Sequence, residues 1–205
     1  MIKRLLVATR NAGKLRELAA ALVPLDIEVV GLETLEDQTD VEETGATFEE
    51  NARLKAEEYS RRTDLPVLAD DSGLEVDALD RAPGVHSARY GGPNLNDEGR
   101  NRKLLEALQQ VPTDLRTARF RCTLAVARAG ETLAIFEGTI EGRILESPRG
   151  NNGFGYDPLF FHPPSGCTTA ELTLADKQRV SHRGQAIAAF LQALKAGDPR
   201  LALSG

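Results

Sequence analysis

The sequence predicts an α/β protein with a parallel or mixed β-sheet flanked by helices. Residues 2–8 form an apolar strand pattern, residues 15–22 place Leu and Ala at helical spacing, and residues 27–32 give a second short strand. A helix between two such strands is typical of a βαβ unit. The apolar run at 67–69 predicts a further buried strand, and the alternation over 118–126 predicts a half-buried one.

Local signals set the ends of the first elements. Asn11 is the predicted N-cap of the first helix, and Pro24 lies at or just beyond its end. Residues 33–44 are acidic and unpatterned, which predicts a loop. The sequence Thr47-Phe48-Glu49-Glu50 matches a capping box and predicts a long helix to about Arg62. The inner stripe of that helix is predicted to contain Phe48, Ala52, Lys55, Ala56 and Tyr59.

The middle of the chain alternates strand and loop patterns. After the strand at 67–69, residues 70–73 predict a turn, from which the strand can resume at 74–76. Residues 80–95 contain several Gly and Pro and predict a loop. A helix is expected from about 96 to 110.

The last part of the chain carries further strands and a final helix. Residues 132–145 supply one or two strands after a hairpin turn at 130–131. A glycine-rich loop follows at 150–158. The final helix begins near His182 or two residues later, and Gly197 ends it.

Composition bounds the class of protein. The chain has 205 residues, 41% of them apolar, which fits one domain over 1–205 with a second lobe at roughly 75–150. A net charge of −6 and a pI near 5.2 argue against nucleic-acid binding. Cys122 and Cys167 are too far apart for a zinc motif, and Cys122 is predicted to be a core residue. The first apolar run is too short for a signal peptide or a membrane span, so we expect a soluble, cytoplasmic protein.

Two adjacent carboxylates, Asp70 and Asp71, follow the strand at 67–69 and precede Ser72 and Gly73. A buried strand that ends in charged groups delivers them to the rim of a sheet, where ligands bind in α/β folds. The two anions repel, so a metal ion, a basic partner or a raised pKa must compensate. The same residue types dominate surface turns, so this stretch alone supports a plain turn equally well.

The segment from Thr9 to Lys14 lies at a strand-to-helix junction. Backbone N–H groups and the helix dipole favour a phosphate there, and Thr9, Asn11 and Lys14 add polar groups and a charge. It is not a Walker A loop, because the leading glycine is missing and Leu15 stands where Ser or Thr would bind magnesium. Such junctions are common, so the signal is weak by itself.

Glu42 and Glu43 add a second pair of carboxylates, in the acidic loop. A charge pair in a loop is usually only solvated. Mg²⁺ bound to phosphates takes about one or two protein carboxylates and keeps several waters. One glutamate and one aspartate from separate loops would therefore be sufficient.

Basic and aromatic residues gather in the C-terminal third. Lys177, His182 and Arg183 fall within seven positions beside a helix start, which suits an anion or a ring with acceptor atoms. Phe154 and Tyr156 stand between glycines and could stack on a base. For Tyr156 a place in the core is at least as well supported.

Six motifs occur in order along the chain. They are Thr9-x-Asn11-x-x-Lys14, Glu42-Glu43-Thr44-Gly45-x-Thr47-Phe48-x-Glu50-Asn51-Ala52, Ala69-Asp70-Asp71-Ser72-Gly73-Leu74, Ala82-Pro83-Gly84-Val85-x-Ser87-Ala88-Arg89-Tyr90, Gly153-Phe154-Gly155-Tyr156-Asp157-Pro158 and Ser181-His182-Arg183-Gly184. Each is weak alone. Together, over about residues 3–196, they resemble the inosine/xanthosine triphosphate pyrophosphatase family, also called the non-canonical purine NTP pyrophosphatases or Ham1-like proteins.

The resemblance implies a Mg²⁺-dependent hydrolase of nucleotide metabolism. Its substrates would be ITP, dITP and XTP, cleaved to the nucleoside monophosphate and pyrophosphate, which keeps these purines out of DNA and RNA. The resemblance also implies a homodimer with no membrane partner. The implied fold is an elongated mixed sheet with flanking helices, in two lobes around a central nucleotide cleft.

The resemblance also implies roles for individual residues. Asp71 would be the general base and, with Glu42, a metal ligand. The residues expected to bind the triphosphate are Thr9, Arg10, Asn11, Ala12, Gly13 and Lys14, with Lys177 assisting. Ser72 would contact the nucleotide. Phe154, Gly155, Tyr156 and Asp157 would line the base and sugar, and His182 and Arg183 would face the oxygen edge of the purine. Relatives often carry a small or polar residue at Arg10, so its role stays open.

Donors in the base site predict selectivity. Hypoxanthine and xanthine present an acceptor at position 6, whereas adenine presents a donor there, so His182, Arg183 and backbone N–H groups would be left unpaired by adenine. We therefore expect strong ITP and XTP activity, weak GTP activity and negligible ATP activity.

Two other functions are open on the residues alone. An aspartyl-phosphate phosphatase also presents an Asp at a strand end, but it usually needs a second Asp two positions later, where Ser72 stands. A non-catalytic sensor of triphosphates would bind without turnover. The intact acidic set argues against the sensor.

Overall fold

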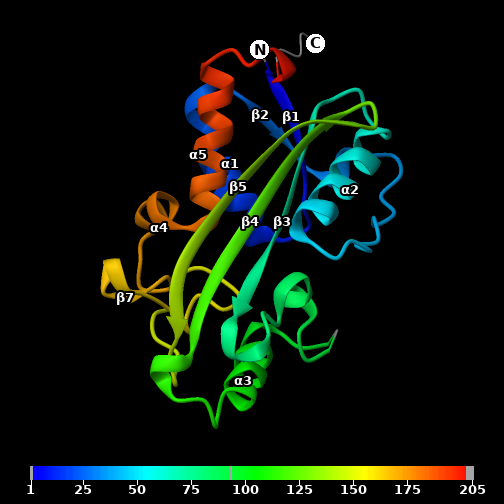
Figure 1. Ribbon diagram of the computed structural model, residues 1–205. Helices are drawn as coiled ribbons and strands as arrows, with labels where there is room; N and C mark the ends of the chain where they lie inside the picture. Colours follow the sequence, from blue (N-terminus) through cyan, green and yellow to red (C-terminus); the bar gives the residue numbers. More distant parts are fainter. Residues whose placement is uncertain (1, 93, 202–205) are drawn as a thin grey trace. The chain divides into compact units, whose positions relative to one another are not determined.

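The computed structural model describes residues 2–92 and 94–201 and contains a seven-stranded sheet (Figure 1). The strands are β1 (Arg4–Ala8), β2 (Glu28–Val30), β3 (Val67–Val76), β4 (Thr117–Arg128), β5 (Glu131–Ile144), β6 (Phe160–His162) and β7 (Cys167–Thr168). Their order across the sheet is β2-β1-β3-β4-β5-β6-β7. Because β1 pairs in parallel with β2 and β3, and β6 pairs antiparallel with β5 and β7, the sheet is mixed. The predicted α/β fold with a mixed sheet is confirmed.

Five α-helices are present among the described residues. They are α1 (Ala12–Leu22), α2 (Phe48–Ser60), α3 (Asp97–Ala107), α4 (Leu174–Val180) and α5 (His182–Lys195). Short 3₁₀ turns lie at Val23–Leu25, Leu32–Thr34, Asp77–Leu79, Gly84–Arg89, Thr113–Leu115, Pro163–Ser165 and Pro199–Leu201. None of the helices in the described part of the chain combines the length and apolar character needed to cross a membrane.

The chain divides into two compact units. The first comprises Met1–Asp71, Cys122–Glu137 and Ala186–Gly205, and the second comprises Ser72–Arg121 and Gly138–Gln185. One boundary falls inside β3, between Asp71 and Ser72. The two lobes around a nucleotide cleft, with the second lobe at roughly 75–150, stay a prediction.

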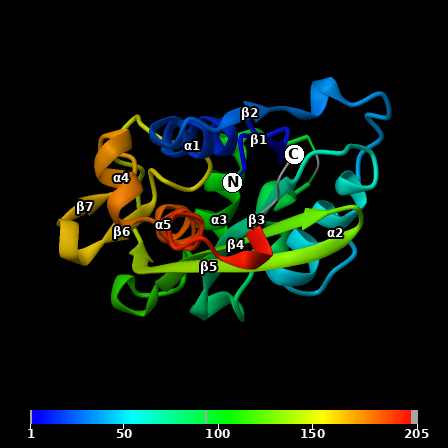
Figure 2. The ribbon, with the colours of Figure 1, turned by 90° about the horizontal axis from the view of Figure 1, so that it is seen from above.

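In the first unit, helices cover both faces of the sheet. Leu5 and Val7 of β1 pack in one buried cluster with α1 and α5, whereas Leu6 and Ala8 pack in another with α2. Successive side chains of a strand point to opposite faces, so the two clusters lie on opposite sides of the sheet. Figure 2 shows α1 and α5 near each other and away from α2.

Local capping explains where the helices of the first unit begin. The Asn11 side chain accepts hydrogen bonds from the N–H groups of Gly13 and Lys14, so Asn11 is the N-cap of α1 as predicted. Thr47 and Glu50 form the predicted capping box of α2. The predicted continuation of α2 to about Arg62 is wrong by two residues, because the helix ends at Ser60.

The predicted turn at 70–73 is wrong. β3 runs without a break from Val67 to Val76 and is buried along most of its length. β1 pairs with β3 only as far as Ala8 opposite Ala69, but β4 borders the other edge of β3 and the strand continues. The two carboxylates of Asp70 and Asp71 therefore lie within the strand, at the point where its parallel neighbour ends.

The second unit has its own apolar core. Leu74 and Val76 of β3 pack with Leu104 and Leu108 at the end of α3 and with Phe160 of β6. This cluster explains the Leu pattern that predicted a helix at 96–110, although α3 is three residues shorter at its C-terminal end. Pro93 of the predicted loop at 80–95 lies outside the described residues.

The second half of the chain departs from the predicted local structure at two points. The hairpin turn lies at Ala129 and Gly130, one residue earlier than predicted, and both have positive φ, as a two-residue hairpin requires. Residues 132–145 contain a single strand, β5, which is one of the two predicted alternatives. α4 was not predicted, although Thr173 caps it by accepting a hydrogen bond from the N–H of Asp176.

Candidate active site

In the first unit, Asp70 is bound on both of its carboxylate oxygens. Lys14 Nζ lies 2.5 Å from Asp70 Oδ1, and the thiol of Cys122 donates to Asp70 Oδ2 at 3.3 Å. Asp70 and Cys122 are buried, and Lys14 is half-buried. Cys122 is thus the core residue that the sequence predicts, with a polar contact in addition. Lys14 is therefore the basic partner that compensates the charge of Asp70.

Asp71 is bound on one oxygen only. Lys55 Nζ donates to Asp71 Oδ1 at 3.2 Å and to the backbone carbonyl of Asp70 at 2.8 Å. Asp71 Oδ2 is buried and has no hydrogen-bond partner among the described residues. A buried carboxylate oxygen without a donor is costly, so this atom is the one that a ligand, water or metal ion would satisfy.

The electrostatics of this cluster follow from burial and from one shared lysine. Burial raises the pKa of Asp71 above its ordinary value, and the nearby Glu43 and Asp70 raise it further, against the attraction of Lys55 and Lys14. Burial alone would lower the pKa of Lys55, but Asp71 and Glu43 outweigh it and the pKa is raised. Lys55 therefore stays charged between two acids.

The fold brings these groups together from separate elements. β1 and β3 are parallel neighbours and their pairing ends at Ala8 opposite Ala69, so Thr9 to Lys14, after β1, come beside the next two residues of β3, Asp70 and Asp71. Lys55 lies on the inner face of α2, one turn after the buried Asn51. The Asn51 side chain accepts a hydrogen bond from the N–H of Gly45 at 2.7 Å, which holds the preceding loop against α2.

The predicted metal ligand Glu42 and its neighbour have different environments. Glu43 Oε1 lies 2.6 Å from Lys55 Nζ and is half-buried. Glu42 is exposed. Glu43 is therefore committed to an internal ion pair, and Glu42 is the glutamate of the pair that faces solvent.

The Thr9–Lys14 segment has its polar groups partly engaged with one another. Thr9 Oγ1 accepts from the N–H of Asn11 at 3.2 Å, and Asn11 caps the N–H groups of Gly13 and Lys14. Ala12 is exposed. Asn11 uses its Oδ1 as the cap acceptor, which leaves its Nδ2 donor outside the cap, and Lys14 supplies the charge at this helix start.

Arg10 is bound to the acidic loop. Its guanidinium lies 2.5 Å from Asp40 Oδ1 and donates to the carbonyl of Gln38 at 2.5 Å. The hydrogen bond and charge of Asp40 raise the pKa of Arg10. This pairing gives Arg10 a structural role at the loop, whereas its role toward a substrate stays a prediction.

In the second unit, Asp157 organises the glycine-rich loop. Asp157 Oδ2 lies 2.5 Å from Lys177 Nζ and accepts the N–H of Phe154 at 2.8 Å, and Asp157 Oδ1 accepts from Thr169 Oγ1 at 2.8 Å. Asp157 and Lys177 are both buried. Asp157 is therefore engaged within the protein, and its predicted contact with the base and sugar would need one of these bonds to be shared.

Two cationic groups lie over the ring of Phe154. Lys177 Nζ lies 4.8 Å and Arg183 Cζ lies 5.6 Å from the ring centroid. Arg183 Nη2 also donates to Ser72 Oγ at 2.7 Å. Four predicted substrate-binding residues of the second unit, Phe154, Lys177, Arg183 and Ser72, are thus brought together.

His182 and Tyr156 are less accessible than the sequence suggested. The His182 ring stacks on Phe120, with centroids 4.8 Å apart, and is buried. Tyr156 is buried in the core, and its hydroxyl donates to the carbonyl of Ser87 at 2.9 Å. Burial raises the pKa of Tyr156. The core alternative weighed for Tyr156 is correct, so its side chain is not a stacking surface.

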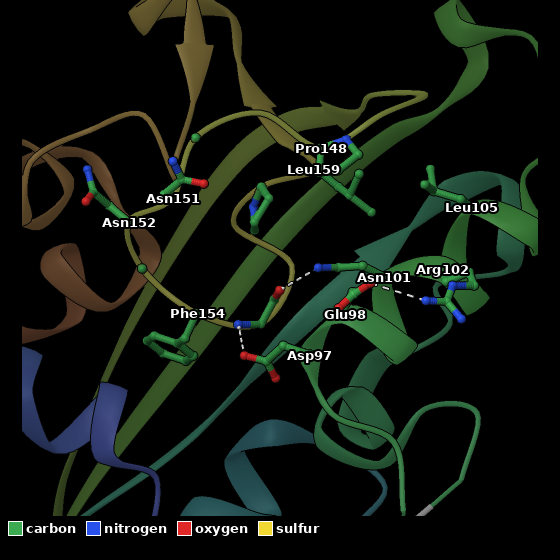
Figure 3. A pocket seen from close by; sticks show the side chains of 14 residues that line it. Asp97, Glu98, Asn101, Arg102, Leu105, Pro148, Asn151, Asn152, Phe154 and Leu159 are labelled. Atoms are coloured by element: carbon green, nitrogen blue, oxygen red, sulfur yellow. Dashed lines mark hydrogen bonds and ion pairs between the residues drawn. The ribbon is translucent and has the colours of Figure 1, made fainter.

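A hollow of about 480 Å³ lies between α3 and the glycine-rich loop of the second unit (Figure 3). Leu105 and Leu159 contribute apolar surface, and Asp97, Asn101 and Asn152 contribute polar groups. Gly155 at the edge of this hollow is bonded to α3 through both of its backbone polar groups.

Sequence reasoning missed two members of the acidic site, Lys55 and Glu43. Lys55 stood on the predicted inner stripe of α2, and a lysine on a buried helix face needs an acid partner. That pattern was the available signal. Glu43 could not be separated from Glu42 by sequence, because which of two adjacent glutamates faces Lys55 depends on how the loop packs against α2.

The residues present fit one Mg²⁺ ion held with substrate. No group of three or more acid, His or Cys side chains that could hold a metal occurs in residues 2–92 and 94–201. Mg²⁺ bound to phosphates needs only about one or two carboxylates. Asp71 Oδ2 supplies one unengaged buried carboxylate oxygen, which matches that requirement.

Comparison with known proteins gives the family. The Ham1 family model matches residues 5–193, almost the whole chain. The chain belongs to the Ham1 family. Among curated relatives of this Ham1-family chain, a dITP/XTP pyrophosphatase of Geobacter sulfurreducens is 57% identical over 185 residues, which are 90% of this chain and 93% of the relative. A protein of the same name from Geobacillus kaustophilus is 53% identical over 91% of each chain.

Solved structures agree with the Ham1 fold. A HAM1 protein from Coxiella burnetii matches with a TM-score of 0.86 and 42% identity, over 96% of this chain and 100% of that chain. A dITP/XTP pyrophosphatase from Mycobacterium abscessus matches with a TM-score of 0.74 and 44% identity, over 92% of this chain and 98% of that chain. The resemblance read from six motifs is therefore confirmed.

Proposed function

We propose that this chain is a dITP/XTP pyrophosphatase that hydrolyses ITP, dITP and XTP to the nucleoside monophosphate and pyrophosphate. The observation that carries the proposal is the set of contacts around Asp70 and Asp71, where one carboxylate holds a lysine and the other keeps a buried oxygen available. Family membership and relatives named dITP/XTP pyrophosphatase, at 57% and 53% identity, support the substrate class.

In this proposal, Asp71 is the general base. Its carboxylate accepts the proton of the attacking water, while Lys55 donates to Oδ1 and fixes the orientation of the carboxylate. Lys14 and the N-terminal end of α1 attract the negative charge of the phosphates. Thr9 to Gly13 line this end, and Asp70 keeps Lys14 in place through the 2.5 Å ion pair.

Magnesium is part of the proposal, with Asp71 and Glu42 as its protein ligands. The metal, when bound, neutralises charge on the leaving pyrophosphate. Glu42 is proposed because it is exposed, whereas Glu43 is committed to Lys55.

Phe154 is proposed as the stacking surface for the base. Arg183 lies over this ring and is a donor that suits a base with acceptor atoms, whereas Lys177, on the same ring, is proposed to assist with the triphosphate. Arg183 and His182 are proposed to donate toward the 6-oxo group of hypoxanthine or xanthine. Adenine would leave these donors unpaired, which costs roughly 1–3 kcal/mol for each donor.

A substrate panel tests the proposed function. The initial rates with ITP, dITP, XTP, GTP and ATP are measured at equal concentrations in excess Mg²⁺. We expect fast hydrolysis of the first three, slow hydrolysis of GTP and negligible hydrolysis of ATP. Hydrolysis of ATP as fast as ITP would contradict the proposed base site.

We also propose that the chain acts as one domain, as a homodimer, and in the cytoplasm, where nucleoside triphosphates are made and used. The family resemblance supports the dimer. Sedimentation equilibrium of the purified protein would test it, since a dimer has twice the mass of 22.2 kDa per chain. A mass of one chain at micromolar concentration would contradict it.

A further inference from the structure

Helix α3 holds both backbone polar groups of Gly155, the residue after Phe154. The N–H of Gly155 donates to Asp97 Oδ2 at 2.6 Å, and its carbonyl accepts from Asn101 Nδ2 at 3.0 Å. Asp97 and Asn101 are one helical turn apart and share a face of α3. Figure 3 shows both side chains pointing toward the loop that carries Phe154.

We propose that Asp97 and Asn101 form a clamp, the α3 clamp, that positions Phe154 as the platform for the base. Both are positioning residues, because they act through Gly155 and need no contact with the substrate. The inference rests on the proposed function. It adds two residues of α3 to the proposed base site, whose other residues lie on the glycine-rich loop and α5.

The loop benefits from such a clamp because glycines flank Phe154 on both sides. Gly153 and Gly155 flank Phe154 with φ of +75° and +61°, in the left-handed region that glycine adopts most easily. Glycine also has the largest range of backbone conformations. With one glycine on each side, the position of the Phe154 ring would be poorly fixed without hydrogen bonds from outside the loop.

The loop is held on its other side by Asp157. Asp157 Oδ2 accepts the N–H of Phe154 at 2.8 Å and the ammonium of Lys177 at 2.5 Å. Phe154 therefore lies between two sets of bonds, one from its own loop and one from α3, more than 50 residues earlier in the chain. The second set ties the backbone beside the platform directly to a helix that lies far from it in the sequence.

α3 is a suitable support because it is anchored in the core of its unit. Leu104 and Leu108 at its C-terminal end are fully buried in the cluster that also contains Leu159. At its N-terminal end, Arg100 pairs with Asp97 Oδ1, so Asp97 is held on one oxygen while the other binds Gly155. A site on a packed helix keeps its geometry better than a site on a loop.

A fluorescent reporter tests the clamp without any enzyme assay. The chain contains no Trp, so Phe154→Trp places a single tryptophan on the platform. Its anisotropy decay is measured alone and combined with Asn101→Ala, Asn101→Asp or Arg102→Ala. Arg102 is the matched control, because it follows Asn101 on α3 and its side chain is exposed and paired with Glu98.

We expect Asn101→Ala to increase the amplitude of nanosecond motion at position 154, and Arg102→Ala to leave it unchanged. Asn101→Asp has the shape of asparagine but loses the N–H donor and turns an oxygen toward the Gly155 carbonyl, so it should increase the motion at least as much. If Asn101→Asp behaves like the parent, shape alone is sufficient and the clamp is contradicted. Unchanged motion in Asn101→Ala contradicts it as well.

Kinetics with the native Phe154 connect the clamp to binding. Asn101→Ala should raise KM for ITP roughly fivefold, as expected for one lost neutral hydrogen bond, with kcat unchanged within about twofold. A fall in kcat together with a large loss of thermal stability would show a structural role and contradict the clamp. Absence of ITP hydrolysis in the unmutated protein would refute the proposed function, and the anisotropy result would still decide on the clamp.

Discussion

Lys14 Nζ lies 2.5 Å from Asp70 Oδ1, and the Asp70 side chain is fully buried. With the Cys122 thiol on Asp70 Oδ2, both oxygens of Asp70 are engaged, whereas Oδ2 of the next residue, Asp71, has no partner among the described residues. Two adjacent carboxylates in one strand thus have different tasks. Asp70 holds a lysine at the start of α1, and Asp71 keeps an oxygen for a ligand.

The Lys14–Asp70 ion pair predicts that substitutions of these two residues have coupled effects on the free energy of unfolding. Lys14→Met should lower the free energy of unfolding by about 3–5 kcal/mol, because it leaves the buried Asp70 carboxylate without its cation. Lys14→Met combined with Asp70→Asn should recover most of this loss. Urea unfolding measures both, with Arg10→Met as the control at the exposed pair with Asp40, where little change is expected. Equal losses in the single and the double variant would show that the two residues are not coupled.

Asp71→Asn should separate binding from turnover. The amide keeps the shape of the carboxylate but cannot accept the proton of the attacking water, so kcat should fall by roughly 10²–10⁴-fold. The affinity for ITP, measured by calorimetry, should change far less. Near-normal kcat in this variant would remove Asp71 from the role of general base.

The raised pKa of Asp71 predicts how stability depends on pH. Because burial raises the pKa of Asp71 in the folded protein above that in the unfolded chain, the folded state binds the proton more tightly. The resulting stabilisation is present at low pH and is lost as pH rises through the folded pKa. Asp71→Asn should therefore raise Tm at pH 8 more than at pH 4, by a few degrees, since 1 kcal/mol corresponds to about 2–4 °C at this chain length.

Thermal unfolding of both metal-free proteins between pH 4 and pH 8 checks this sign. Asp80→Asn is a suitable control, because it changes one carboxylate outside the Asp71 cluster. A larger stabilising effect of Asp71→Asn at pH 4 than at pH 8 would contradict the electrostatic account of Asp71.

The two glutamates of the acidic loop should respond differently to neutralisation. Glu42→Gln should raise the Mg²⁺ concentration required for half-maximal activity by roughly tenfold or more, because it removes one of two proposed protein ligands. Glu43→Gln should leave that concentration closer to normal and lower the pKa of Lys55, because one of its two acid partners is gone. A magnesium titration of each variant measures the first effect. If Glu43→Gln raised the required Mg²⁺ concentration more than Glu42→Gln, the metal ligand would be Glu43 and not Glu42.

Sequence signals that act within one turn or one strand predicted the fold well. Asn11 and Thr47 mark the starts of α1 and α2 because a cap depends on residues only two or three positions away. The alternation in β4 identified one buried face for the same reason, but Thr123, Ala125 and Ala127 are buried as well, so β4 is not the half-buried strand that was predicted beyond Cys122. The family motifs then linked these elements to a known fold.

Interactions between distant segments could not be predicted. Asp70 to Gly73 have the composition of a turn, yet β4 along the other edge keeps them in a continuous strand. The pairing of Lys55 with Asp71 and Glu43 depends on how α2 and its preceding loop pack, which no local pattern encodes. α4 was missed because it has only seven residues and little apolar periodicity.

Identification of the products formed from ITP shows which phosphoanhydride bond the protein cleaves. The purified protein is incubated with ITP and Mg²⁺, and the phosphorus-containing products are separated and identified at early times. We expect inosine monophosphate and pyrophosphate in equal amounts, and at most traces of either at these early times when Asp71→Asn replaces the unmutated protein. Release of inosine diphosphate and orthophosphate would contradict the proposed function, because the bond broken would then be the terminal one.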